Sequence, residues 1–170
     1  MTDASYPMRR KDRELTREDA LRIVRAAPFA VLSTAGADSR PYGVPVNAVY
    51  LDGAIYFHGT TGTSRKADNL AGNPAVSLCF TAYERCVPGE YSTDYACAVV
   101  DGTAELVTDE AERTRAFVAI SRAHAQGDND EVHLERISKG GAYARVWRVR
   151  ILQLSGKSRS WPMVSKELPL

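Results

Sequence analysis

The sequence predicts a mainly β, α+β domain: a six-stranded antiparallel β-barrel with helices on its outside. Six strand-like segments follow one another, mostly at hairpin-like spacing, and only three helical segments interrupt them. This order lacks the regular strand–helix alternation of a doubly wound parallel sheet. The chain has 170 residues and is 44% hydrophobic, so it can bury one substantial core.

Local signals place the helices and strands along the chain. Thr16 provides a capping hydroxyl with the Asp19 carboxylate three residues on, so it starts a helix that Pro28 ends. Gly72 and Pro74 close the second helix, and acidic residues fill the first turn of the third. The helices are expected at 16–27, 64–71 and 109–125, and the strands at 29–35, 42–51, 54–58, 75–83, 96–107 and 142–155.

The ends of the chain and one connection carry little structural signal. Residues 1–15 are interpreted as a charged arm and residues 156–170 as a tail, which leaves 16–155 as the folded domain. Residues 84–94 show no hydrophobic period and are expected to form an irregular loop. Gly102 is expected to mark a bulge within its strand.

The dipeptide Asp52-Gly53 is the strongest hairpin signal in the chain. Its two-residue turn pairs Leu51 with Ala54, and the same register places Asn47 opposite His58. One face of the hairpin is apolar and is expected to point into the barrel. The other face is polar without charge, which suits a ligand site or a partner subunit, although plain surface exposure explains it equally well. That face carries Asn47, Tyr56, His58 and Thr60.

A Gly/Thr loop, Gly59 to Thr63, follows this hairpin and leads into the second helix. It lacks the order of a Walker P-loop, yet hydroxyl groups, helix-start amides and two cations follow in succession. Arg65 and Lys66 occupy the first helical turn, where positive charge opposes the helix dipole. A bound dianion would reverse that unfavourable interaction, whereas two solvated basic residues are the alternative interpretation.

Composition excludes several classes of partner. The 22 basic and 21 acidic residues leave a net charge of +1, so neither a nucleic acid nor an anionic membrane is expected to bind. No apolar stretch is long enough to span a bilayer. The three cysteines have no ligand-like spacing, and His124 and His133 match no metal pattern, so no metal site is predicted. Unpaired cysteines and a polar N-terminus favour the cytoplasm.

Several short motifs, in order, resemble one known family. They are Met8-Arg-Arg-Lys-Asp-Arg-Glu-Leu15, Phe29-Ala-Val-Leu-Ser-Thr34, Arg40-Pro-Tyr-Gly-Val-Pro-Val-Asn47, Ile55-Tyr-Phe-His-Gly59, Gly62 with Lys66, Asn73-Pro-Ala-Val76 and Val99-Val-Asp-Gly-Thr-Ala104. This pattern resembles the FMN-binding split β-barrel proteins related to pyridoxamine 5'-phosphate oxidase, in the nitroimidazole-resistance (Nim-type) branch. The resemblance covers most of the chain from about residue 8 to residue 155 and is weakest at 84–95 and 124–141.

The resemblance implies a six-stranded split barrel that forms a homodimer, with FMN in grooves between the subunits. Carried over to this sequence, Pro45, Val46 and Asn47 would run beside the flavin ring, and His58 would lie close to it. The same comparison assigns the FMN phosphate to the start of the second helix. Its ligands there would be the basic side chains of Arg65 and Lys66, with hydroxyls from Thr63 or Ser64.

The function implied is an FMN-dependent oxidoreductase. Reduced nicotinamide would supply a hydride to the flavin, which would reduce a small molecule such as a nitro compound. His58 would serve as the catalytic residue, donating a proton or a hydrogen bond. Three alternatives stay open: the same fold holding a deazaflavin, the same fold holding haem, and a flavin-binding or flavin-sensing module without turnover.

Overall fold

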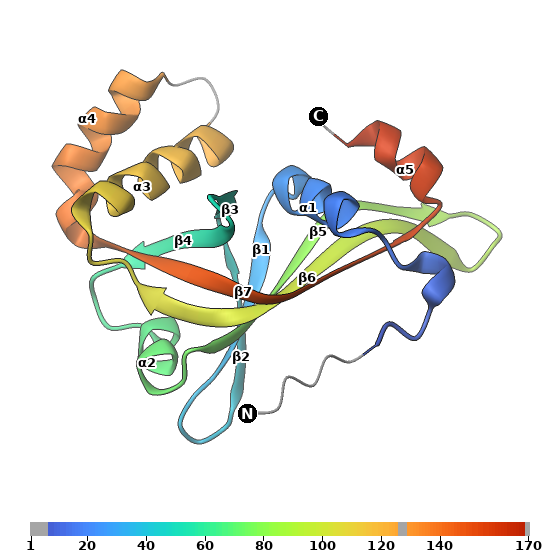
Figure 1. Cartoon of the computed structure of the whole chain (residues 1–170), viewed down its shortest axis with the longest axis horizontal. Helices are drawn as coiled ribbons and strands as arrows, with labels where there is room; N and C mark the ends of the chain where they lie inside the picture. The colour runs from blue at the N-terminus through green and yellow to red at the C-terminus, as the bar shows by residue number, and fades with distance from the viewer. Residues whose placement is uncertain (1–6, 126–128, 169–170) are drawn as a thin grey trace.

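The computed structural model describes residues 7–125 and 129–168 and shows a curved antiparallel sheet with helices packed around it (Figure 1). Within these residues the sheet has seven strands in the order β2-β1-β5-β6-β7-β4-β3. The strands are β1 (Ala30–Ala35), β2 (Pro41–Val46), β3 (Ala48–Leu51), β4 (Ala54–Thr60), β5 (Ala75–Val87), β6 (Ser92–Leu106) and β7 (Ala144–Arg159). The α-helices are α1 (Arg17–Ala26), α2 (Arg65–Gly72), α3 (Glu110–His124), α4 (Asp130–Gly140) and α5 (Trp161–Glu167).

The two outer strands of the sheet, β2 and β3, are consecutive in the chain. β2 pairs with β1, β3 pairs with β4, and only Asn47 lies between them. Because β2 leads directly into β3, the two edges of the sheet meet at Asn47, and the sheet closes into a barrel there. The antiparallel α+β class predicted from the sequence is confirmed. The count of six strands is wrong for the described residues, because the expected strand 42–51 changes its pairing partner at Asn47.

The Asp52-Gly53 hairpin forms with the predicted register. Asp52 and Gly53 both have positive φ, 49° and 85°, as a two-residue hairpin turn of this sequence requires. Leu51 pairs with Ala54, and the ladder continues back to Ala48. The expected pairing of Asn47 with His58 does not form, because the chain leaves the ladder at Asn47 to join β2.

The apolar face of this hairpin points into the barrel, as predicted. Ile55 and Phe57 are fully buried there, and Phe57 stacks on Trp147 of β7 with ring centroids 5.5 Å apart. Leu32 of β1 and Leu78 of β5 are buried in the same core. The period-2 pattern of the strands thus determines which side chains fill the barrel.

α3 covers the opposite face of the hairpin around Tyr56, whereas Asn47, His58 and Thr60 of that face are exposed. Tyr56 is buried there, beside Phe117. Its hydroxyl donates to Glu112 Oε1 at 2.8 Å, and Arg148 donates to the same oxygen at 2.9 Å. Burial, reinforced by Glu112, raises the pKa of Tyr56. Neither a ligand-facing position nor plain surface exposure therefore holds for Tyr56, since it anchors α3 to the sheet.

The long hairpin of β5 and β6 corrects a second expectation. Residues 84–94 were expected to form an irregular loop, but β5 runs to Val87 and β6 begins at Ser92. Their polar, exposed side chains conceal the strand period, because this part of the hairpin extends past the core. The bulge predicted at Gly102 is confirmed, since the register of β6 against β7 shifts between Asp101 and Gly102.

Replacing Gly102 by alanine is expected to destabilise the fold by about 1–3 kcal/mol. A Cβ at this position would lie 2.4 Å from the Arg150 carbonyl oxygen and 2.6 Å from a Val149 methyl. The carbonyl belongs to the backbone and cannot rotate away. Thermal unfolding measures the loss, with Gly72→Ala as the control, because nothing lies within 4 Å of a Cβ there. Equal melting temperatures for the two variants would refute the steric argument.

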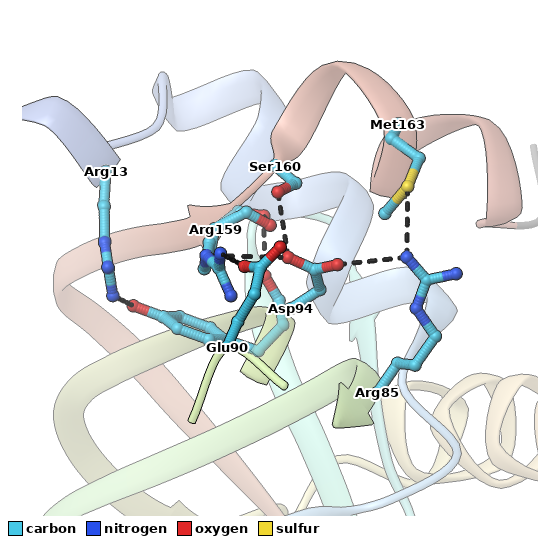
Figure 2. A network of polar contacts seen from close by, with 9 residues as sticks. Arg13, Arg85, Glu90, Asp94, Arg159, Ser160 and Met163 are labelled. Atoms are coloured by element: carbon cyan, nitrogen blue, oxygen red, sulfur yellow. Dashed lines mark hydrogen bonds and ion pairs between the residues drawn. The ribbon is translucent and has the colours of Figure 1, made fainter. Parts of the chain in front are cut away.

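The far end of the β5–β6 hairpin is tied to the C-terminal helix through a buried carboxylate. Asp94 accepts hydrogen bonds from Arg85 Nη2 at 3.0 Å and from Ser160 Oγ at 2.9 Å (Figure 2). These hydrogen bonds lower the pKa of Asp94, and the bond from Arg85 has the larger effect. Arg159 approaches the same carboxylate and also pairs with Glu90.

The last described residues contribute to the core. β7 continues to Arg159, beyond the strand end expected at residue 155. Val164 of α5 is fully buried and Leu168 is 6% exposed, in the same core as the barrel side chains. Among the residues that the structure describes, no helix is long and apolar enough to cross a membrane.

Candidate functional site

The candidate site lies where β4 ends and α2 begins, at the end of the barrel. The predicted short helix is present, and Ser64 caps it by accepting a hydrogen bond from the Ala67 amide at 3.2 Å. The preceding loop is held against the segment just before β7, because the Thr61 amide donates to the Tyr143 carbonyl at 2.9 Å. The side chain of Thr63 is exposed. The loop thus presents its hydroxyls beside a fixed helix start.

Lys66 turns back from α2 over the end of the barrel core. Its Nζ donates to the His58 carbonyl at 3.2 Å and lies 5.5 Å from the ring centre of Phe57 and 5.6 Å from that of Trp147. Burial lowers the pKa of this ammonium group. No carboxylate pairs with Lys66 among the described residues. A half-buried cation without a counter-ion is unusual, because ions leave water at a high cost.

Gly59 allows Lys66 this position. A Cβ on Gly59 would lie 2.9 Å from Lys66 Nζ and 3.1 Å from the Trp147 ring. A side chain at this position would therefore displace the Lys66 ammonium group and crowd the indole, so glycine leaves room for both. The sequence showed Gly59 as the start of a Gly/Thr loop and as the end of a family motif, but its contact with Trp147 could not be predicted because β7 lies far along the chain.

Arg65 connects α2 to the start of β2. Its guanidinium lies 4.7 Å from the ring centre of Tyr42 and donates to the Pro41 carbonyl at 3.2 Å. Arg65 is exposed and, like Lys66, has no acidic partner within the described part of the chain. Two cations therefore stand unneutralised in the first turn of one helix.

The expected ring-binding strand lies along β2 and its junction with β3. Pro45 and Asn47 are exposed, whereas Val46 is buried in the core, so only its backbone is available to a ligand. Arg65 reaches the beginning of this strand. In the ranges that the structure describes, no hydrogen bond or ring contact joins Asn47 to His58 or Lys66, although Asn47 directly precedes Ala48, which pairs with Phe57 of β4.

His58 is exposed at the end of β4, with one side of its ring against Phe117. The ring centroids are 6.0 Å apart and the planes tilt by 55°. Partial burial is the main cause that lowers the pKa of His58 from its ordinary value of 6.5, and the charge of Lys66 and the nearby His124 add to it. These contacts therefore favour the neutral form of the imidazole.

Sequence reasoning missed Tyr42 and Trp147 as parts of this region. Both are aromatic residues of predicted strands, and nothing in the local pattern joins either to α2. Both are brought there by long-range pairing, since β7 lies beside β4 and pairs Trp147 with Phe57.

Known proteins provide an independent comparison for this geometry. The family described as pyridoxamine 5'-phosphate oxidase matches residues 16–158. No curated protein matches the chain. A conserved hypothetical protein of Mycobacterium tuberculosis has a similar structure, with a TM-score of 0.74 and 19% identity over 96% of this chain and 95% of that one.

Two further solved structures share the fold. A candidate 5-nitroimidazole antibiotic resistance protein of Bacteroides thetaiotaomicron gives a TM-score of 0.68 and 21% identity, over 85% of this chain and 86% of its own. An FAD- and haem-binding protein of Mycobacterium smegmatis gives a TM-score of 0.60 and 20% identity, over 85% of this chain and 72% of its own. At these identities the structures establish the fold alone, and the family match over most of the sequence goes further: this chain belongs to the pyridoxamine 5'-phosphate oxidase family.

Proposed function

We propose that this protein binds FMN and uses it as an oxidoreductase. The observation that carries the proposal is the pair of unneutralised cations, Arg65 and Lys66, at the start of α2 beside exposed hydroxyls. A phosphate dianion complements two cations and a helix N-terminus, and its charge offsets their mutual repulsion. Flavin and haem binding by a protein of the same fold supports a cofactor of this size.

In the proposed complex, Arg65, Lys66 and a hydroxyl from Thr63 or Ser64 hold the phosphate. The backbone of β2 and its junction, from Pro45 through Val46 to Asn47, lies along the ring. When bound, FMN would supply the redox chemistry, which is hydride transfer from reduced nicotinamide followed by reduction of a small acceptor such as a nitro compound.

His58 is the residue proposed to meet the acceptor. Its pKa is lowered, which favours the neutral imidazole, a form with one N–H donor and one acceptor nitrogen. A hydrogen bond that orients the acceptor is therefore favoured over proton donation from an imidazolium.

A homodimer completes the proposal. Phe29, just before β1, and Val31 within it are 48% and 37% exposed, and Val31 pairs with Pro45 on one side and Cys79 on the other. This apolar strip borders the proposed ring strand, so a second subunit docked there would cover both. Light scattering at several protein concentrations measures the mass directly, and a monomer at all of them would overturn this part.

The absorbance spectrum of the purified protein, followed by FMN titration, tests the cofactor. We expect flavin bands and a stoichiometry of one FMN per chain. A Soret band would instead identify haem, and the absorbance of a deazaflavin would identify that cofactor. Oxidation of reduced nicotinamide with and without a nitro acceptor then separates an enzyme from a binding module. A protein that retains no flavin after soaking would overturn the proposal.

A further inference from the structure

A cavity lies away from the start of α2, between the C-terminal ends of α1 and α3 and the strand β3. Its volume is about 560 Å³, within the range of small-molecule sites. α1 and the residues after it, β3, and α3 each contribute one wall. The lining residues are Val24, Arg25, Ala26, Ala27, Pro28, Ala48, Val49, Tyr50, Ala119, Arg122, Ala123 and His124.

The charged residues of this cavity are all basic. Arg25, Arg122 and His124 line it, and none of its described lining residues is acidic. Arg122 pairs with Asp130, which lies outside the lining. Arg25 has no ion pair within the described ranges, and its guanidinium lies 4.9 Å from the ring centre of Tyr50. One cation thus remains available, held over an aromatic surface.

His124 orders the wall formed by β3. Its Nε2 lies 3.2 Å from the Ala48 carbonyl oxygen, which can only accept a hydrogen bond. Nε2 therefore carries a proton, and this contact fixes the end of α3 against the strand. Alanine, valine and proline side chains form most of the remaining lining, so the cavity offers an apolar body with cationic groups at its rim.

We infer that this cavity binds an organic carboxylate with a flat, conjugated body. Arg25 would receive the carboxylate through a charge-assisted hydrogen bond, and Tyr50 with the apolar wall would receive the ring. Basic residues in the last turns of α1 and α3 also complement the helix dipoles, which accounts for their presence but not for a cavity between them. The inference is independent of flavin binding.

Binding of 2-naphthoate, compared with the uncharged 2-naphthamide of nearly the same shape, tests the inference by calorimetry. We expect naphthoate to bind at least tenfold more tightly than naphthamide. Arg25→Gln should weaken naphthoate about tenfold or more and leave naphthamide unchanged. Arg17→Gln, at the other end of α1 and outside the cavity, is the matched control and should bind both as the unmodified protein does.

Ala123→Leu, at an exposed lining position on α3, should block both probes while the melting temperature is retained. Equal binding of the two probes, or naphthoate binding unaffected by Arg25→Gln, would overturn the inference. The titrations are made with and without FMN. If FMN displaces naphthoate, the cavity belongs to the flavin site and the inference fails, whereas a protein that binds naphthoate but no FMN refutes only the proposed function.

Discussion

Replacing Lys66 by methionine is expected to weaken FMN binding about 10- to 100-fold, the usual effect of losing one charge-assisted contact. Riboflavin, which has the same ring but no phosphate, should lose much less affinity. Methionine keeps an unbranched apolar chain of similar length beside Phe57 and Trp147 and removes the ammonium group that lies over their rings, so the change is mainly one of charge. Fluorescence titration with both flavins measures the ratio of the two dissociation constants.

The control for this experiment is Lys166→Met. Lys166 is exposed on α5, away from α2, and its removal changes the net charge equally. It should leave both flavin affinities unchanged. If Lys66→Met weakens FMN and riboflavin to the same extent, Lys66 supports the barrel end through its bond to the His58 carbonyl rather than holding the phosphate.

The largest effect on stability is expected at Phe57. Phe57→Ala should lower the free energy of unfolding by about 3–5 kcal/mol, because the ring is fully buried and its removal leaves a cavity beneath Trp147. For a chain of this size that corresponds to a fall of about 6–20 °C in melting temperature. Calorimetry or circular dichroism detects it directly.

Two variants make the Phe57 result interpretable. Phe57→Leu retains most of the apolar volume and should cost less than half as much as the alanine. Leu106→Ala, where 48% of the leucine is exposed, should change stability by only a fraction of that amount. If the Phe57→Ala and Leu106→Ala proteins have the same melting temperature, the stacked pair of Phe57 and Trp147 contributes little to the stability of the fold.

The elements with strong local signals were predictable from the sequence. Thr16 caps α1 and accepts the Asp19 amide at 3.1 Å, as its spacing indicates. Asp52-Gly53 sets both the turn and the register because few residues other than glycine, asparagine and aspartate tolerate positive φ. The helix start at Arg65 was also correct, since Ser64 is a favourable cap.

The remaining features depend on contacts between distant segments. The strand pattern places Tyr56 on the polar face of the hairpin, but α3 covers it, and its hydroxyl donates a hydrogen bond to Glu112. The same holds in the candidate site: Arg65 and Lys66 were recognisable as cations in a first helical turn, yet their contacts with Tyr42 and Trp147 were not. Neither α4 nor α5 was expected, because their sequences resemble polar connections until a packed neighbour is present.

The interruption at Asn47 has a consequence for how firmly the barrel is registered. Because β2 and β3 are joined through a single residue, sliding β3 along β4 also displaces β2 along β1. Alternative alignments must disrupt two ladders at once and turn buried side chains on both outward. In an open sheet each edge strand can shift its register alone, whereas here a register shift of β2 or β3 also requires the other strand to move.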